Sequence, residues 1–228
     1  MAELLLELLS EEIPARMQAK AAADLKRLFT DELNKNGLTF DKAEAYVTPR
    51  RLALVINGLP SVQPDITVER KGPKVGAPDK AIEGFLKSAG LDSLDQCEVR
   101  EIKGTEFHFI VQKKKGGSVT GEIIDILPSV VWSFPWPKSM RWADRRTRYV
   151  RPLHEFVLLF DGKTIDLVLS MEGNIPLRAG NRTVGHRFLA PNEFEVKNFA
   201  DYSARLEKAF VMLDAEKRKD VIRNGASR

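Results

Sequence analysis

Leucines alternate with other residues at the start of the chain, a pattern typical of a β-strand. Leu4, Leu6 and Leu8 would lie on one face of that strand. The opposite face would then carry Glu3, Leu5, Glu7 and Leu9. We therefore expect residues 3–9 to form a strand that is covered on one side. A leucine-rich helix is the alternative for the same residues.

The following segment has apolar residues at helical spacing. Pro14 can occupy the first position of this helix, with Glu11 and Glu12 near its positive end. Asn36 and Gly37 supply a left-handed stop. The predicted buried stripe comprises Met17, Ala21, Leu25, Leu28, Phe29 and Leu33.

Two short strands are predicted at 45–47 and 51–57, with Pro49 in the turn between them. The prolines and glycines between residues 62 and 79 favour a loop or linker with one short strand. The later pattern predicts a helix at 79–90 and a hairpin at 97–102 and 107–113. A helical stripe at 123–134 is expected to be kinked or restarted at Pro128. Strands are expected at 156–160 and 165–169 around Asp161 and Gly162, followed by a charged helical tail at 200–223.

Helices mixed with hairpin-linked strands predict the α+β class, with mixed or antiparallel sheets, packed helices and two subdomains. We expect an N-terminal α+β unit at 1–75 and a mainly β unit with basic loops at 76–199. The start of a helical region is expected at 200–228.

The composition is that of a soluble globular protein, with 43% hydrophobic residues and 36 basic against 32 acidic side chains. Cys97 is the only cysteine, which excludes an internal disulfide and favours a reducing compartment. Apolar runs are far shorter than the roughly 20 residues needed to cross a bilayer. The acidic N-terminus does not resemble a signal peptide. These features predict a cytoplasmic protein without a membrane partner.

Several catalytic motifs are excluded by their spacing. Gly116 and Gly121 are followed by Glu122 where a phosphate-binding loop needs lysine. His154 begins a zinc-protease pattern, but Leu158 replaces the second histidine. The sequence therefore predicts neither a metal site nor a catalytic residue, and the few histidines are best explained as structural or surface residues.

Positive charge gathers in two segments, which makes nucleic acid a candidate partner. We call residues 138–151 the cationic loop, because it has six basic residues against the single anion Asp144, with aromatic rings interleaved. Guanidinium groups can neutralise phosphates and rings can stack on unpaired bases. The alternative is a solvated charged face with the tryptophans as core anchors. Residues 178–187 form a second basic segment, in which Gly180 and Gly185 would let the backbone approach a phosphate.

The candidate RNA contacts are Arg50, Arg51, Lys138, Arg141, Trp142, Arg145, Arg146, Arg148, Arg151, Arg182, His186 and Arg187.

Six short motifs occur in a fixed order: SEEIPARM (10–17), TPRRLA (48–53), KGP (71–73), PKSMRW (137–142), YVRPLH (149–154) and GHRF (185–188). Together they resemble the N-terminal part of the beta subunit of bacterial glycyl-tRNA synthetase. The similarity covers essentially the whole chain.

This resemblance implies an α2β2 class II aminoacyl-tRNA synthetase that joins glycine to its tRNA using ATP with magnesium. It places the adenylate-forming site in a separate alpha subunit, and it makes the beta subunit chiefly the tRNA-binding partner. Family members are longer, which implies that this chain is one part of such a subunit. No cofactor is expected in this part, and no DNA partner.

Three functions follow as hypotheses. The first is a non-catalytic, tRNA-binding part of the beta subunit. The second is a subunit-interaction module that docks the alpha subunit without contacting tRNA, since arginine and tryptophan are common interface anchors. The third, less favoured, is a hydrolase that uses His154 or His186 beside a carboxylate.

Overall fold

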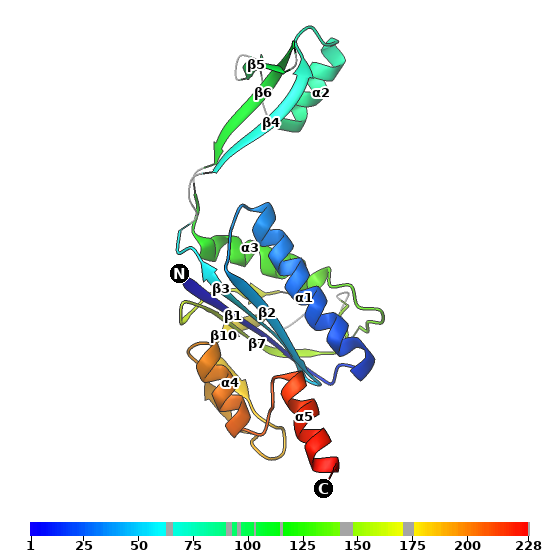
Figure 1. Cartoon of the computed structure of the whole chain (residues 1–228), viewed down its shortest axis with the longest axis vertical. Helices are drawn as coiled ribbons and strands as arrows, with labels where there is room; N and C mark the ends of the chain where they lie inside the picture. Colours follow the sequence, from blue (N-terminus) through cyan, green and yellow to red (C-terminus); the bar gives the residue numbers. More distant parts are fainter. Residues whose placement is uncertain are drawn as a thin grey trace. The chain divides into compact units, whose positions relative to one another are not determined.

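The computed structural model describes residues 1–62, 66–89, 93–94, 97–102, 104–114, 116–141, 148–170 and 176–227 (Figure 1). The chain forms two compact units, one from Met1–Ser61 with Ser118–Arg228 and the other from Val62–Gly117. The first unit is therefore discontinuous, and its limits differ from the predicted boundaries at 75 and 199. The reason is that its central strand pairs with segments on both sides of the inserted unit.

The first unit is built on a mostly antiparallel sheet with strand order β2-β3-β1-β7-β10-β9, and β8 also pairs with β7. Only the pairing of β10 with β7 is parallel among these described strands. The strands are β1 (Ala2–Ser10), β2 (Lys42–Thr48), β3 (Arg51–Leu59), β7 (Leu153–Phe160), β8 (Lys163–Thr164), β9 (Val168–Leu169) and β10 (Leu177–Gly180).

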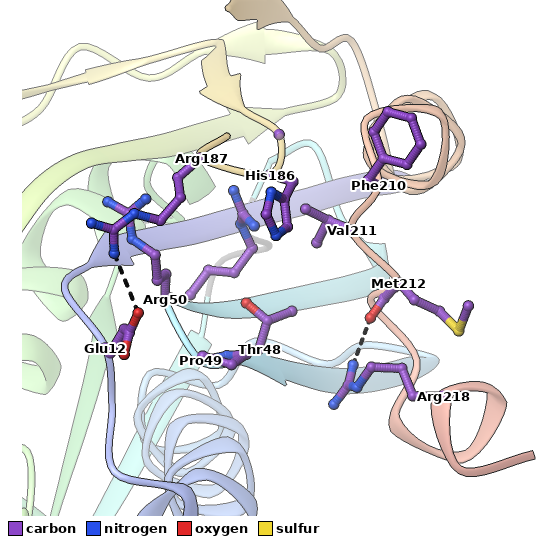
Figure 2. Close-up of a pocket in the computed structure, with 12 residues that line it drawn as sticks. Glu12, Thr48, Pro49, Arg50, His186, Arg187, Phe210, Val211, Met212 and Arg218 are labelled. Carbon is purple, nitrogen blue, oxygen red and sulfur yellow. Dashed lines mark hydrogen bonds and ion pairs between the residues drawn. The ribbon is translucent and has the colours of Figure 1, made fainter. Parts of the chain in front are cut away.

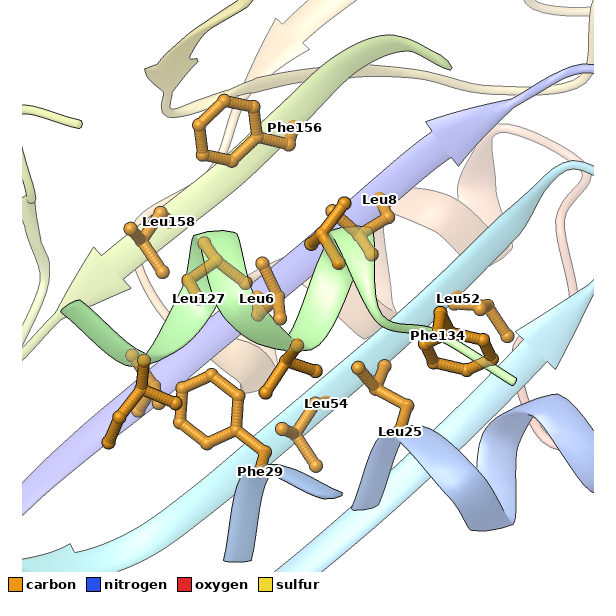
Figure 3. Close-up of a cluster of buried hydrophobic side chains, with 14 of the residues drawn as sticks. Leu6, Leu8, Leu25, Phe29, Leu52, Leu54, Leu127, Phe134, Phe156 and Leu158 are labelled. Atoms are coloured by element: carbon orange, nitrogen blue, oxygen red, sulfur yellow. The ribbon is translucent and has the colours of Figure 1, made fainter. Parts of the chain in front are cut away.

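The first strand is confirmed, but the expectation that it is covered on one side is wrong. One face, with Leu6 and Leu8, packs under helices α1 (Ala15–Lys35) and α3 (Val119–Trp132) (Figure 3). The other face, with Leu5, packs against helix α4 (Phe199–Lys208). Glu7 made this second face look polar in the sequence. Its carboxylate is buried among polar partners, as described below.

The predicted long helix is confirmed as α1. Pro14 occupies the position before the helix, not its first turn. Gly37 has φ of 72°, the left-handed conformation expected of a C-terminal glycine. Helix α3 is continuous through Pro128, so the helix does not restart there. Proline removes one backbone hydrogen bond, and the burial of this helix in the core keeps it intact.

Two predicted turns set strand pairing in this sheet. Thr48 pairs with Arg51 across the turn that contains Pro49, which confirms the β2–β3 hairpin. Asp161 and Gly162 both have positive φ, as a type I′ hairpin turn between β7 and β8 requires. The single strand predicted at 165–169 is wrong, because β8 ends at Thr164 and β9 pairs with β10 instead.

The second unit contains a three-stranded antiparallel sheet, in the order β4-β6-β5, and one helix. Its elements are β4 (Ile66–Lys74), α2 (Asp79–Ala89), β5 (Glu98–Ile102) and β6 (Thr105–Lys114). The helix and the hairpin are confirmed. The strand predicted within 62–79 is present but longer than expected, because β4 runs through Gly72 and Pro73. A register shift between Lys71 and Lys74 accommodates these two residues.

The C-terminal part of the first unit contains β11 (Arg182–Val184), β12 (Glu193–Glu195), α4 and α5 (Ala215–Ala226). The helical tail predicted at 200–223 is interrupted, because Phe210 adopts a left-handed conformation with φ of 61°. Asn198 and Asp214 cap the two helices with their side chains. The α+β class is confirmed. In the described part of the chain, no helix combines the length and apolar character required for crossing a bilayer.

Candidate functional site

Four neighbouring strands of the central sheet, β1, β2, β3 and β7, each begin or end at the same edge of the sheet, which is formed by strand ends. Thr48 ends β2 beside Arg51 at the start of β3, and Ser10 at the end of β1 pairs with Leu153 at the start of β7. The loops at this edge are joined by backbone hydrogen bonds. Those from Ser10 N to Arg50 O and from Ile13 N to Pro49 O measure 2.7 and 2.6 Å. The motif segments 10–17, 48–53 and 149–154 therefore converge here.

A buried ionic network attaches the C-terminal part of the unit to this edge. The Glu7 carboxylate accepts hydrogen bonds from Arg51 Nε at 3.0 Å, from Thr183 Oγ1 at 2.5 Å and from the Tyr202 hydroxyl. Arg51 also donates to the Val184 carbonyl at 2.5 Å. Arg51 is 3% exposed and its charge is neutralised by Glu7, so its role is to hold β11 in place and not to offer a free cation to RNA. This corrects the prediction of Arg51 as a phosphate contact.

The GHRF motif follows β11 directly and is shaped by contact with the chain after α4. A Cβ atom added at Gly185 would lie 2.4 Å from Ala209 Cβ, so only glycine fits there. The His186 backbone amide donates to the Ala209 carbonyl at 2.9 Å. Gly185 thus allows close approach of the protein's own backbone, while the approach of a phosphate at this glycine stays a prediction. The His186 ring accepts from the Phe188 and Leu189 amides through Nδ1.

Between these segments lies a cavity of about 260 Å³, which we call the sheet-end cavity (Figure 2). Four arginines and one glutamate are among the residues that line it. The lining residues are Glu12, Thr48, Pro49, Arg50, Arg51, Gly185, His186, Arg187, Phe210, Val211, Met212 and Arg218.

Arg187 is an exposed cation of this cavity and Arg50 a half-buried one, and both face carboxylates. Arg187 lies 3.3 Å from the Glu12 carboxylate, and Arg50 lies 3.8 Å from that of Glu11. Both pairs are partly exposed, with the Arg187 side chain 45% accessible. The same two arginines also line a neighbouring cavity of about 300 Å³.

His154 Nε2 lies 2.7 Å from Glu11 Oε1. This hydrogen bond is the main cause of a lowered pKa for the Glu11 carboxyl, and the nearby positive charges of Arg50 and Arg187 add to it. The pair has the histidine–carboxylate geometry that the hydrolase hypothesis requires. However, the adjacent Ser10 hydroxyl donates to the Glu11 carbonyl and not to the imidazole, so this serine is not arranged as a nucleophile.

Arg218 supports the far wall of the cavity. It donates to the carbonyls of Met212 at 2.6 Å, Leu213 at 2.9 Å and Val47 at 3.0 Å. These bonds fasten the segment between α4 and α5 onto β2. Carbonyls do not cancel the charge of the guanidinium, and within the described residues no carboxylate is paired with Arg218.

The cationic loop is described at 138–141 and 148–151. Lys138, Arg141 and Arg148 are exposed, and within the described ranges none of them forms an ion pair. Arg151 donates to the Val150 carbonyl at 2.8 Å. The predicted contacts Trp142, Arg145 and Arg146 lie outside the described residues.

Two aromatic rings in and beside the cationic loop, those of Tyr149 and Trp136, are structural. Tyr149 is 1% exposed and packs edge-on against Trp136, with ring centroids 5.1 Å apart. Trp136 in turn packs against Phe134 at 4.6 Å. Tyr149 is therefore not available to stack on bases, and the alternative interpretation of the tryptophans as anchors is confirmed for Trp136.

Arginines of the second basic segment are paired with carboxylates. Arg178 lies 2.6 Å from Asp166, and Arg182 lies 3.1 Å from Glu195. The exposed cations of the two basic segments are therefore not equivalent, because those of the second are largely neutralised by neighbours. Among the described residues, no three His, Cys, Asp or Glu side chains gather in a way that could hold a metal ion.

The sequence did not single out Glu12, Phe210 or Arg218 as site residues. Glu12 belongs to one of the motif segments, and grouping these segments in space would have found it. Phe210 and Arg218 lie outside all six motifs, so only the tertiary structure reveals them.

Comparison with known proteins gives a consistent result over the whole chain. The family described as glycyl-tRNA synthetase beta subunit matches residues 4–228. A glycine–tRNA ligase beta subunit from Rhodospirillum centenum is 45% identical across 99% of this chain. Those from Paracoccus denitrificans and Cereibacter sphaeroides are 49% and 50% identical across 100% and 97% of it. This chain covers 34%, 33% and 32% of these three relatives, which is about a third of their length.

Proposed function

Because this chain belongs to the glycyl-tRNA synthetase beta subunit family, we propose that it is a tRNA-binding part of such a subunit. In this role it supports the ATP-dependent attachment of glycine to tRNA in the cytoplasm. The bond-forming chemistry, with ATP and magnesium, belongs to a separate alpha subunit in an α2β2 class II enzyme. The part described here contributes binding and no catalytic residue.

The observation that supports tRNA binding is the state of the cationic loop. Lys138, Arg141 and Arg148 are exposed and carry no ion pair within the described part of the chain. Cations of this kind attract phosphates strongly, because binding releases the counterions condensed on the nucleic acid. The paired arginines of the second basic segment offer less net charge to a polyanion, because each shares its charge with a carboxylate. We therefore assign the main RNA contact to the cationic loop.

A second candidate function is docking of the alpha subunit. It is favoured by three large apolar side chains at loop tips, since Phe188, Leu189 and Phe210 are 76%, 62% and 62% exposed. Exposed aromatic residues beside an arginine are typical of interface hot spots. This function would use the GHRF motif and would not require the cationic loop.

The test is a triple variant of the cationic loop, Lys138→Gln, Arg141→Gln and Arg148→Gln. We expect it to bind tRNA more weakly than the unchanged chain at low salt. We also expect a shallower dependence of log K on log salt, by up to about 0.7 to 0.9 for each phosphate that the variant no longer neutralises. The measurement is a filter-binding titration at several salt concentrations.

The matched control is Lys26→Gln, Lys35→Gln and Lys42→Gln, which removes the same charge from exposed positions on α1 and β2. It should leave the salt dependence nearly unchanged. Equal weakening in both triple variants would mean that only net charge matters. Unchanged binding of the cationic-loop variant, together with loss of alpha-subunit binding in a Phe188→Ser variant, would favour the docking function.

A further inference from the structure

The sheet-end cavity has an excess of positive charge. Of its four arginines, Arg51 is neutralised by Glu7, while Arg218 is bonded to carbonyls that leave its charge uncancelled. Arg50 and Arg187 face Glu11 and Glu12 in partly exposed pairs. Such pairs are weak in water, so a phosphate can replace the carboxylate at little cost. The cavity is therefore suited to an anion.

Phe210 lies at the rim of this cavity, on the side away from Arg50 and Arg187 (Figure 2). Its φ of 61° is a conformation that a bulky residue rarely adopts, and its side chain is 62% exposed. The adjacent backbone is held by a hydrogen bond from Val211 N to Leu206 O at 2.8 Å. Glycine or asparagine normally ends a helix in this way. An exposed aromatic ring at the rim of a cationic cavity is suited to stacking on a planar group of a ligand.

A guanidinium pair and an exposed ring are the components with which proteins hold unpaired nucleotides. The cavity volume of about 260 Å³ lies just below the usual range for ligand pockets, about 300–1,000 Å³, so it suits one small unit and not a duplex. We propose that the sheet-end cavity binds a single unpaired nucleotide of RNA, with its phosphate between Arg50 and Arg187 and its base on Phe210. The choice of RNA rests on the proposed function.

The charge distribution favours a nucleotide over a protein segment at this position. An apolar anchor from a partner protein would have to bury Arg218 without an anion to compensate it, which is costly, and would leave Arg50 and Arg187 with only their loosely held carboxylates. A phosphate compensates them directly. Phe188 and Leu189 do not line the cavity, so they remain available for protein contact in either case.

The test is calorimetric titration of the full 228-residue chain with four ligands: adenosine 5′-monophosphate, ribose 5-phosphate, inorganic phosphate and the trinucleotide ApApA. We expect adenosine monophosphate to bind roughly tenfold more tightly than ribose 5-phosphate, because base–aromatic stacking contributes on that scale. ApApA should bind at least as tightly as the mononucleotide. The two sources of the ligand, free nucleotide and RNA, are distinguished by this last comparison.

Two variants separate the base from the phosphate. Phe210→Gly removes the ring and suits the left-handed backbone, so the fold should be retained. It should weaken nucleotide binding about tenfold and leave phosphate binding unchanged. Arg187→Gln should weaken binding of all four ligands. The control Arg182→Gln removes the same charge outside the cavity and should change none of them.

Three results would overturn this proposal: equal affinity for adenosine monophosphate and phosphate, absence of nucleotide binding at millimolar concentration, or binding of the mononucleotide but not of ApApA. Loss of alpha-subunit binding in Phe210→Gly with unchanged nucleotide affinity would assign the residue to a protein interface instead. None of these results affects the cationic-loop titration with tRNA. Failure of that titration, in turn, would remove the proposed function while the nucleotide affinities could still be measured.

Discussion

Two arginine–carboxylate pairs in the first unit have nearly the same geometry and opposite surroundings. Arg51 lies 3.0 Å from Glu7, and Arg182 lies 3.1 Å from Glu195. The side chains of the first pair are 4% and 1% exposed, whereas those of the second are 62% and 59% exposed. Burial, and not distance, therefore decides what each pair does. Water screens the second pair, while protein encloses the first almost completely.

For function, this means that arginines of the same chemistry have different roles according to their burial and pairing. The buried pair positions β11 and so places the GHRF motif beside the 48–53 turn. The exposed pair only lowers the charge that the second basic segment offers to a polyanion. Lys138, Arg141 and Arg148 carry no such pair within the described ranges and stay available. A count of basic residues cannot distinguish these three situations.

The largest effect is expected from Arg51→Gln. Removing this guanidinium leaves the Glu7 carboxylate buried and unpaired, so we expect a loss of roughly 3–5 kcal/mol in the free energy of unfolding. Urea denaturation measures it. The double variant Arg51→Gln with Glu7→Gln should recover much of the loss, because no buried charge remains. A loss below about 1 kcal/mol in the single variant is what an exposed pair would give. It would contradict the conclusion that burial separates the Arg51–Glu7 pair from the Arg182–Glu195 pair.

A smaller effect is expected from Tyr202→Phe. This change removes one hydrogen bond to the Glu7 carboxylate and keeps the fully buried ring, so we expect a loss of roughly 1.5–3 kcal/mol. Urea denaturation at neutral pH again measures it. Tyr46→Phe is the matched control, because the Tyr46 ring is only partly buried. Equal losses in the two variants would show that the bond to Glu7 contributes nothing specific.

Because of the same tyrosine, the free energy of unfolding should depend on pH. Burial, and secondly the charge of Glu7, raises the pKa of Tyr202 well above its ordinary value of 10.0. Burial likewise raises the pKa of Tyr149. A raised pKa means that stability is fully present below pH 10 and falls above it, because only the unfolded chain then releases these protons. Tyr202→Phe should reduce the slope above pH 10 by up to about 1.4 kcal/mol per pH unit.

Much of the fold follows from local patterns. Alternating leucines predict β1, the stripe from Met17 to Leu33 predicts α1, and Asp161 with Gly162 predicts a tight hairpin turn. Two predictions failed because they depend on the tertiary structure: the limits of the first unit and the burial of β1 on one face only. The inserted unit and the cover on the second face of β1 depend on contacts between segments distant in the chain, such as Leu5 with Tyr202.

The site was less predictable than the fold. The chemistry of Glu7 depends on residues 51, 183 and 202, and no local pattern relates them. A polar residue facing away from a leucine row indicates a solvated position unless its partners are known. The positive φ of Phe210 has the same origin, since glycine is the usual signal for such a position. Charge patterns predicted where the cations are, but not which of them are paired.

The smallest effect is expected at the exposed pair, measured by a double-mutant cycle of Arg182→Gln and Glu195→Gln. We expect a coupling energy of roughly 0.2–1 kcal/mol at low salt, because both ends are solvated. The coupling should shrink further at 1 M salt, where the Debye length is about 3 Å. The Arg51–Glu7 cycle under the same conditions should change little with salt, since salt screens buried pairs much less than exposed ones. If both cycles had the same salt dependence, burial would not be the property that separates the two pairs, and the arginines of the second basic segment would have to be counted as fixed structural ions.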